Sequence, residues 1–302
     1  FCAYIWEALA DLGEHDLAKK ALQHGIDLQN SDGSVPAYSD KKWICLTGVA
    51  QMALVGYKIG ATDFSNKCMN YLGSIQNNTG GFLGSVGRGA NYFPTEEPSW
   101  AVKYYLDAFS EKQRSIFNMS AETFPREIKE DDNRVTTVIN GLGNINDKIV
   151  LDAGCGQGRY LKILANKFPN ADLHGVDISD VMLKNNPASI TTSIGSLLEI
   201  NYPDNTFDCV YSVEALEHSL RPEAAIGELT RILKLNGKLI IIDKSTEKIG
   251  KIKLNTWEQW FDPKTLAEKM EEYGIKTTYK PIAYDKCETP DGWFYVWEGT
   301  KQ

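Results

Sequence analysis

A single five-residue segment constrains the fold of this chain more than any other feature. Residues 154–158 read Gly-Cys-Gly-Gln-Gly; they follow an apolar run that ends at Asp152 and precede a helical pattern that begins at Arg159. Glycine lets the backbone turn tightly and lets a ligand approach without a Cβ atom in the way, and a helix begins with a partial positive charge. A strand, a glycine-rich turn and a helix in this order predict a ligand site at the carboxyl edge of a parallel sheet.

The rest of the C-terminal two thirds alternates in the same way. Short apolar runs predict strands at 148–152, 172–177, 190–194, 207–212, 238–243, 276–282 and 293–299. Helical patterns predict helices at 131–140, 159–168, 222–233 and 263–273, and one that starts at Ser179. Such alternation predicts an α/β fold, a Rossmann-like, doubly wound sheet of seven strands, parallel and with helices on both faces.

The N-terminal third contains an internal repeat. Residues 28–35 align with residues 75–82 when the sequence is shifted by 47 positions, and Gly13 then falls on Gly60. A period in the forties is typical of a helical-hairpin repeat. The expected helices lie at 1–12, 15–29, 43–59, 63–77 and 97–110. We therefore expect an all-α domain over 1–110, a helical connection at 111–130, and an α/β domain over 111–302.

The loops at 29–35 and 76–82, which share a Gln-Asn-x-x-Gly pattern, resemble those of the α/α-toroid repeats of terpenoid cyclases and protein prenyltransferase β-subunits. Fewer hairpins are present than in a complete toroid, so we expect a partial toroid and a chain that is the C-terminal part of a longer protein. The catalytic acid and the zinc ligands of those families are missing. A packing module is therefore expected, and the alternative is a groove for a lipid or polysaccharide precursor. The loop 78–97 and four aromatic residues would line that groove: Trp43, Trp100, Tyr104 and Tyr105.

Composition excludes several classes of partner. Thirty-two basic and forty acidic residues give a net charge of −8, which repels a polyphosphate and disfavours nucleic acid. The longest apolar runs are too short to span a bilayer. The six cysteines form no CxxC pair and no Cys/His cluster, so we expect reduced thiols, no metal site and a cytoplasmic protein.

Two details of the glycine-rich turn distinguish between possible cofactors. The spacing is GxGxG rather than the GxGxxG of nicotinamide enzymes, and Asp152 stands two residues before the first glycine. A carboxylate in that place repels a pyrophosphate and suits a ligand with an ammonium group. Asp177 ends the next expected strand, 19 residues after Gly158, where it can accept hydrogen bonds from both hydroxyls of a ribose.

These segments resemble the motifs of class I S-adenosylmethionine-dependent methyltransferases. The resemblance rests on five segments in the order of that family: 150–159, 175–179, 202–210, 212–218 and 229–239. It covers about residues 130–300 and implies S-adenosylmethionine as the cofactor. The backbone of the turn would hold the methionine part, Asp152 its amino group and Asp177 the ribose. Ser196 departs from the family, which usually has an acidic residue there. The cofactor-binding residues that the resemblance implies are Asp152, Ala153, Gly154, Gly156, Gly158, Asp177, Ile178, Met182, Ser196, Leu197 and Val213.

Methyl transfer to oxygen or nitrogen needs a group that accepts a proton near the methyl group. His218, with an ordinary pKa near 6.5, and Glu214 are the candidates, since both follow the strand expected at 207–212. The alternative for His218 is that it has no catalytic role, because histidine is frequent at this turn in related sequences with different acceptors. The alternative for Glu214 is that it only contacts the substrate or the methionine part of the cofactor. The acceptor pocket is expected from the segments 115–134, 244–261 and 284–293. There Trp257 and Trp260 would form an aromatic lid or pack against the sheet.

The function predicted from these residues is methyl transfer to an O, N or C atom of a small-molecule or carrier-bound intermediate. One alternative is an NAD(P)-dependent oxidoreductase of similar topology, which the spacing and Asp152 disfavour. The other is a non-catalytic binding or scaffold protein, which the intact glycines and Asp177 disfavour. A nucleic-acid methyltransferase is disfavoured by charge and by the absence of an Asn-Pro-Pro-Tyr-type turn. The sequence leaves the acceptor and the oligomeric state open.

Overall fold

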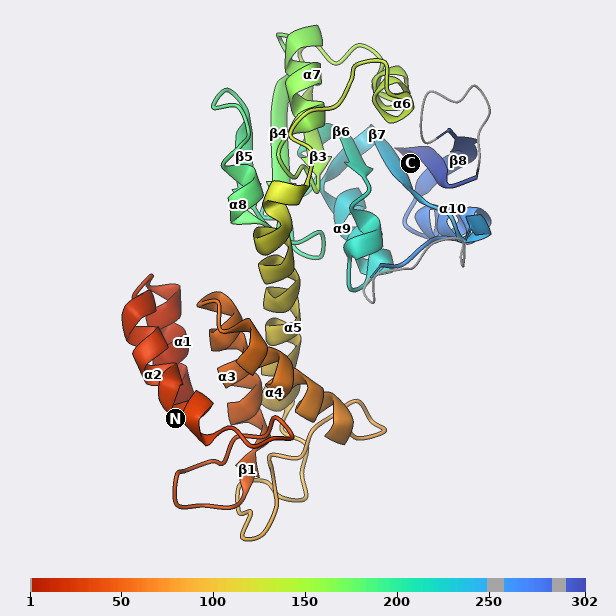
Figure 1. The fold of residues 1–302 in the computed structure, drawn as a ribbon. Coiled ribbons are helices and arrows are strands. Elements are labelled where there is room, and N and C mark those ends of the chain that lie inside the picture. Colours follow the sequence, from red (N-terminus) through yellow and green to blue (C-terminus); the bar gives the residue numbers. More distant parts are fainter. Residues whose placement is uncertain (1, 249–257, 284–291) are drawn as a thin grey trace. The chain divides into compact units, whose positions relative to one another are not determined.

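A computed structural model describes residues 2–248, 258–283 and 292–302 (Figure 1). The chain divides into two compact units, Phe1–Ile116 and Phe117–Gln302, and each is described by itself. None of the helices in the described part of the chain combines the length and the apolar composition that a membrane span requires.

The first unit is built from helices around one central helix. Its elements are α1 (Cys2–Asp11), α2 (His15–Leu28), β1 (Ile44–Cys45), α3 (Leu46–Lys58), α4 (Thr62–Ile75), β2 (Ser85–Val86) and most of α5 (Ser99–Ser120). Helix α3 is buried over most of its length, whereas α2 and α4 bury one side each. A helix that is apolar on all sides needs neighbours on all sides, and this explains why α3 forms the centre of the core.

The 47-residue repeat is also a repeat of hydrogen bonds. Gln29 Nε2 donates to Gly33 O (3.3 Å), and Gln76 Nε2 donates to Gly80 O (2.7 Å). In both turns the glycine has a positive φ, +92° at Gly33 and +83° at Gly80. The two matching sequences therefore form the same turn after equivalent helices.

Two expectations for this region need correction. The helix expected from residue 43 begins at Leu46, because Ile44 and Cys45 pair with β2 instead. The helix expected at 97–110 runs without a break from Ser99 to Ser120 as α5. The helical connection expected at 111–130 is therefore the second half of α5, followed by the short 3₁₀ helix η1 (Ala121–Thr123).

The second unit contains a seven-stranded sheet. The strand order is β5 (Thr191–Ile194), β4 (Asp172–Asp177), β3 (Ile149–Ala153), β6 (Phe207–Val213), β7 (Leu233–Lys244), β9 (Phe294–Lys301) and β8 (Ile275–Ile282). The first five strands are parallel, but β9 is antiparallel to both of its neighbours. The sheet is therefore mixed, and the expectation of an entirely parallel sheet is wrong at this edge.

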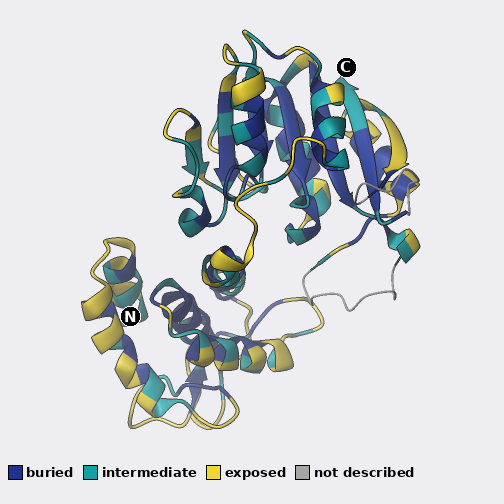
Figure 2. Cartoon of the chain, turned by 45° about the horizontal axis from the view of Figure 1, so that its top comes forward, coloured by how far each residue is buried: buried dark blue, intermediate teal, exposed yellow. Residues whose placement is uncertain are grey.

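Helices cover both faces of this sheet, as expected for a doubly wound fold. The strand residues Leu151, Val210 and Ile241 share a core with α9 (Pro222–Ile232) and α10 (Pro263–Glu272). On the other face a second core joins the strands to α6 (Asn133–Leu142) and α7 (Arg159–Lys167). The central strands lie buried between these layers (Figure 2). From β3 the chain adds β4 and β5 on one side and then returns to add β6 and β7 on the other side. Ligands of such sheets bind where the strand order reverses, so the carboxyl end of β3 is the expected place for a ligand.

Candidate cofactor site and active site

The turn after β3 contains three glycines with positive φ, Gly154 (+88°), Gly156 (+50°) and Gly158 (+72°). Two of them are required by the protein's own packing. A Cβ at Gly154 would overlap the side chain of Ala215, and one at Gly158 would overlap the amide of Asn186. Gly158 also begins α7 in the left-handed conformation.

Gly156 differs from its two neighbours. A Cβ there would lie 3.6 Å from Met182 Sδ, at an ordinary contact distance. Met182 itself is buried on α8 (Asp180–Leu183). The protein's own packing therefore does not require a glycine at position 156 as it does at 154 and 158, and the backbone there can be approached by a ligand more closely than a residue with a Cβ would allow.

Asp177 connects this turn to the end of β4. Its Oδ2 accepts a hydrogen bond from Gly156 N (2.8 Å), and its Oδ1 accepts one from Ser179 N (2.8 Å). Ser179 then caps α8, since its Oγ accepts from Met182 N (3.1 Å). Burial raises the pKa of Asp177. The half-buried Ile178 follows Asp177 at the same strand end.

Asp152 lies at the end of β3, opposite Tyr211 of β6. Its carboxyl is 2% exposed and accepts a hydrogen bond from Tyr211 Oη (3.0 Å). Burial raises the pKa of Asp152 to about 7; the nearby Asp177 acts in the same direction, and the Tyr211 hydroxyl and Arg159 oppose it. The two carboxylates expected to bind a cofactor therefore lie within electrostatic reach of each other.

Ser196 and Leu197 come after β5. Gly195 N donates to Asp177 O (3.0 Å), and this bond holds the turn beside the end of β4. Ser196 Oγ accepts from Leu198 N (3.2 Å), so its side chain stabilises its own turn. Leu197 is half-buried on the α9 face of the sheet. Val213, the last residue of β6, is buried in the other core.

Glu214 follows Val213 with a φ of +53°, which is unusual for a residue with a side chain. Its Oε1 pairs with the guanidinium of Arg134 and lies 3.4 Å from Arg159 Nη2. Arg134 also makes an ion pair with Asp132 (2.9 Å), the residue that caps α6. Glu214 Oε1 thus lies between the guanidinium groups of Arg134 and Arg159.

Arg134 and Asp132 are the functional-site residues that sequence reasoning missed. An Asp just before a helix is a visible capping signal, and it predicts the start of α6. It does not reveal that Arg134 reaches Glu214, a residue 80 positions further along the chain.

His218 ends the short 3₁₀ helix η2 (Leu216–His218) after β6. Its ring meets the edge of Phe117, with ring centres 5.1 Å apart. Its Nε2 lies 3.3 Å from Glu217 Oε1. Burial, reinforced by the positive charge of Lys244, lowers the pKa of His218 to about 4.

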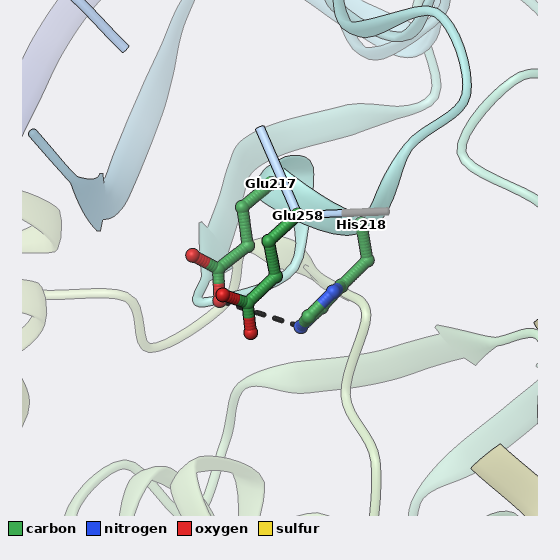
Figure 3. A group of neighbouring side chains, drawn as sticks. All are labelled: Glu217, His218 and Glu258. Carbon is green, nitrogen blue, oxygen red and sulfur yellow. Dashed lines mark ion pairs between the residues drawn. The ribbon is translucent and has the colours of Figure 1, made fainter. Parts of the chain in front are cut away.

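Glu217, His218 and Glu258 form a cluster whose possible ligand atoms lie within 4.8 Å of one another (Figure 3). Lys244 Nζ already contacts two of them, Glu217 Oε1 at 2.9 Å and Glu258 Oε1 at 3.5 Å. A buried ammonium therefore supplies positive charge where a metal would, and we assign no metal here. It also means that Lys244 is engaged with protein carboxylates rather than available to an anionic acceptor.

The remaining acceptor-pocket expectations have mixed outcomes. Trp260 is 8% exposed and packs edge-to-face on Trp293 (5.8 Å), so it is buried rather than part of an open lid. Phe117 reaches His218, which brings the segment before α6 to the active-site side. Trp257 and most of the segment 284–293 lie outside the described residues.

Comparison with known proteins agrees with this geometry. Residues 151–241 match the family described as the methyltransferase domain. This segment, less than half of the chain, is therefore similar to a methyltransferase domain, and it contains Asp152, Asp177 and His218.

One curated relative is the 2-methyl-6-phytyl-1,4-hydroquinone methyltransferase of Synechocystis sp. strain PCC 6803, 29% identical over 171 residues. The match covers 50% of this chain and 54% of that protein, so the chain spans about half the length of the relative. Two solved structures share the fold of the second unit. One is a chain from the complex of the Haloferax volcanii Trm112 methyltransferase activator with its methyltransferase partner. It has a TM-score of 0.52 and 19% identity, and the match covers 61% of this chain and 96% of that one. The other is the [4+2]-cyclase SpnF, with a TM-score of 0.53, 16% identity and coverage of 64% and 96%.

Proposed function

We propose that this protein transfers a methyl group from S-adenosylmethionine to a small-molecule acceptor. The observation that carries the proposal is the meeting of two strand ends at the glycine-rich turn, where Asp177 accepts a hydrogen bond from Gly156 N and lies within electrostatic reach of the buried Asp152. That combination suits a ligand with an ammonium group, a ribose and a flat base. When bound, the cofactor supplies a methyl group activated by a positive sulfur.

The residues of this chain would divide the binding between them. Asp177 accepts hydrogen bonds from the ribose, and Asp152 in its ionised form attracts the ammonium. The backbone of Ala153, Gly154 and Gly156 lies along the methionine part. Ile178 and Met182 pack on the base. Ser196, Leu197 and Val213 complete the wall at the ends of β5 and β6, and Gly158 supports the turn by beginning α7.

His218 is the better of the two candidates for the proton acceptor. Its lowered pKa keeps the ring neutral at physiological pH, and a neutral ring can accept a proton. Glu214 Oε1 is already engaged by the guanidinium groups of Arg134 and Arg159. We assign Glu214 a positioning role.

The curated relative acts, by its name, on a hydroquinone that carries a phytyl chain, and we extend this class of acceptor to the present chain. A hydroquinone ring has acidic hydroxyls and nucleophilic carbons, both suitable acceptors. A carrier-bound intermediate is the second class of acceptor that the sequence suggests.

A cytoplasmic setting is consistent with the free thiols of Cys2, Cys45, Cys68, Cys155 and Cys209. The partial toroid assignment of the first unit stays a prediction.

Calorimetric titration tests the proposal at the level of the cofactor. S-Adenosylhomocysteine is expected to bind with one site per chain, and NADH is expected not to bind. Binding of NADH alone would favour the oxidoreductase, and binding of neither would favour the scaffold.

A second assay tests the acceptor and the base. Transfer of a tritiated methyl group to 2-methyl-6-phytyl-1,4-hydroquinone is expected. His218→Asn should lower kcat about 100-fold and leave the affinity for S-adenosylhomocysteine unchanged. An equal loss of both would show that His218 only supports the fold.

A further inference from the structure

The amino-acid end of S-adenosylmethionine has two charges on one carbon atom, an ammonium group and a carboxylate. The proposed function provides a partner for the first of these charges, the carboxylate of Asp152, but none for the second. A charged group that leaves water without a partner weakens binding. A cation near Asp152 would therefore complete the recognition of this end of the cofactor.

Arg159 is such a cation. It is the first residue of α7, at the end of the glycine-rich turn that follows Asp152, and it lies within electrostatic reach of that carboxylate. Its guanidinium lies 5.3 Å from the ring centre of Tyr160. The rings of Tyr160 and Tyr211 meet edge-to-face at 6.4 Å, and Tyr211 Oη donates to Asp152. Packed side chains therefore connect the cation to the carboxylate.

The two arginines of this region differ in how far the protein uses their donors. Arg134 donates to both carboxylate oxygens of Asp132 and to Glu214 Oε1. In the part of the chain that the structure describes, the Arg159 guanidinium donates one hydrogen bond, from Nη2 to the same oxygen of Glu214 at 3.4 Å. A guanidinium carries five N–H donors, so most of those of Arg159 are left for a ligand. Its side chain is 21% exposed, against 10% for Arg134, so a ligand can reach it.

We propose that Arg159 binds the carboxylate of the amino-acid part of S-adenosylmethionine. Asp152 and Arg159 then supply one charge for the ammonium group and one for the carboxylate. Arginine suits this role because its planar group can form two parallel hydrogen bonds with one carboxylate. The inference rests on the proposed function and adds a residue that selects a ligand with a complete amino-acid end.

Four adenosine ligands separate the two charges. S-Adenosylhomocysteine has both, S-adenosyl-3-thiopropylamine has only the ammonium, S-adenosyl-4-thiobutyrate has only the carboxylate, and 5′-methylthioadenosine has neither. Calorimetry on the whole chain measures the four dissociation constants for the parent, Arg159→Met and Asp152→Asn. A pH of 8.5, above the pKa of about 7 of Asp152, keeps that carboxyl ionised. No acceptor is present, so any effect concerns the carboxylate of the cofactor and not one of an acceptor.

Arg159→Met should weaken S-adenosylhomocysteine and the thiobutyrate about 30-fold, as expected for the loss of hydrogen bonds to a charged group. The thiopropylamine should bind as well as to the parent or more tightly, and 5′-methylthioadenosine should be unaffected. Asp152→Asn should give the complementary pattern, in which the thiopropylamine is weakened and the thiobutyrate is not. Lys167→Met, which removes a positive charge from the exposed end of the same helix, should match the parent for all four ligands.

The outcomes distinguish this inference from the proposed function. If the parent and Arg159→Met bind S-adenosylhomocysteine equally well, the inference is overturned and the cofactor assignment stands. An equal loss for 5′-methylthioadenosine would also overturn it, because Arg159 would then only support the turn. A parent chain that binds none of the four ligands would overturn both. Should Arg159→Met fail to fold, Arg159→Lys keeps the charge without the planar group; it should weaken S-adenosylhomocysteine about fivefold and leave the thiopropylamine unchanged, and an equal loss for these two ligands would overturn the inference.

Discussion

The two units of this protein both use glycines in the left-handed region, but for different reasons. In the helical unit Gly33 and Gly80 close equivalent turns, and each turn is completed by a nearby Gln side chain. In the sheet unit Gly156 N is bound by Asp177, which comes from the neighbouring strand. The first kind of turn is closed locally, whereas the second joins the ends of two strands at the proposed cofactor site.

The atoms around each glycine separate the two uses further. A Cβ at Gly33 would overlap the backbone carbonyl of Lys67, and a Cβ at Gly156 would make only an ordinary contact with Met182. A positive φ alone therefore does not identify a ligand-facing glycine. What distinguishes Gly156 is that its N–H binds a carboxylate of the neighbouring strand end, whereas the turns at Gly33 and Gly80 are completed by a Gln of their own segment.

The largest effect is expected at Gly33. Gly33→Ala combines a φ of +92° with an overlap against backbone and should lower the free energy of unfolding of the helical unit by about 4 kcal/mol. Urea unfolding followed by tryptophan fluorescence measures it. The affinity for S-adenosylhomocysteine at low denaturant should not change, and a stability loss below that of Gly80→Ala would contradict the packing argument.

Gly156→Ala should have the opposite effect to Gly33→Ala, with a small loss of stability and a large loss of affinity for S-adenosylhomocysteine. Its φ of +50° costs about 1–2 kcal/mol of stability, but the new methyl group lies at the proposed cofactor site. We expect the Kd of S-adenosylhomocysteine to rise about 100-fold. Gly89→Ala is the control for a positive φ alone, since that glycine has a φ of +82° and a Cβ there would meet nothing within 4 Å. Equal affinities in the two variants would remove Gly156 from the site.

Asp152→Asn should weaken S-adenosylhomocysteine about 30-fold, as expected for loss of a buried charge pair. Binding of 5′-methylthioadenosine, which has the ribose and base but no amino-acid part, should be unchanged. Equal losses for both ligands would show that Asp152 supports the turn instead of the ammonium.

The same carboxyl predicts a pH dependence with a definite sign. Because burial raises the pKa of Asp152 to about 7, the carboxyl is protonated below that pH and no longer attracts an ammonium. The Kd of S-adenosylhomocysteine should therefore rise as the pH falls from 8 to 5, by up to about tenfold per unit. The dependence should be absent in Asp152→Asn and for 5′-methylthioadenosine.

Gly80→Ala is expected to have the smallest effect. Its φ is +83°, but a Cβ there would meet nothing within 4 Å, so the cost is the conformational penalty of about 1 kcal/mol. A difference from Gly33→Ala of several kcal/mol in urea unfolding would confirm that the repeat conserves a turn while its surroundings differ.

The parts of the fold that depend on local sequence could be predicted. The order of strand, glycine turn and helix around residue 154 and the 47-residue repeat are both confirmed, because each is encoded within a short segment. The placement of β9 between β7 and β8 could not be read in the same way. The apolar pattern of a strand does not indicate whether it runs parallel or antiparallel to its neighbours, and β9 pairs with residues 50 to 62 positions earlier, from Lys244↔Phe294 to Lys238↔Thr300.

The candidate site also combines features that local sequence predicts with features that depend on packing. The sequence predicts which residues end the strands, so the positions of Asp152, Asp177 and His218 follow from the order of elements. It does not predict that Arg134 reaches Glu214 or that Lys244 reaches Glu217. Those pairs depend on how separate segments pack, and they determine which carboxylates are engaged by cations.

The position of β9 has a consequence for synthesis on the ribosome. Among the residues that the structure describes, β8 pairs with no strand other than β9, which is translated after it. Lys301 at the end of β9 also donates hydrogen bonds to the carbonyls of Thr230 and Leu233. The nascent chain can therefore assemble β3 to β7 early, while β7 keeps an unpaired edge until β9 leaves the exit tunnel. During that interval the growing polypeptide exposes an edge strand of the kind that chaperones protect.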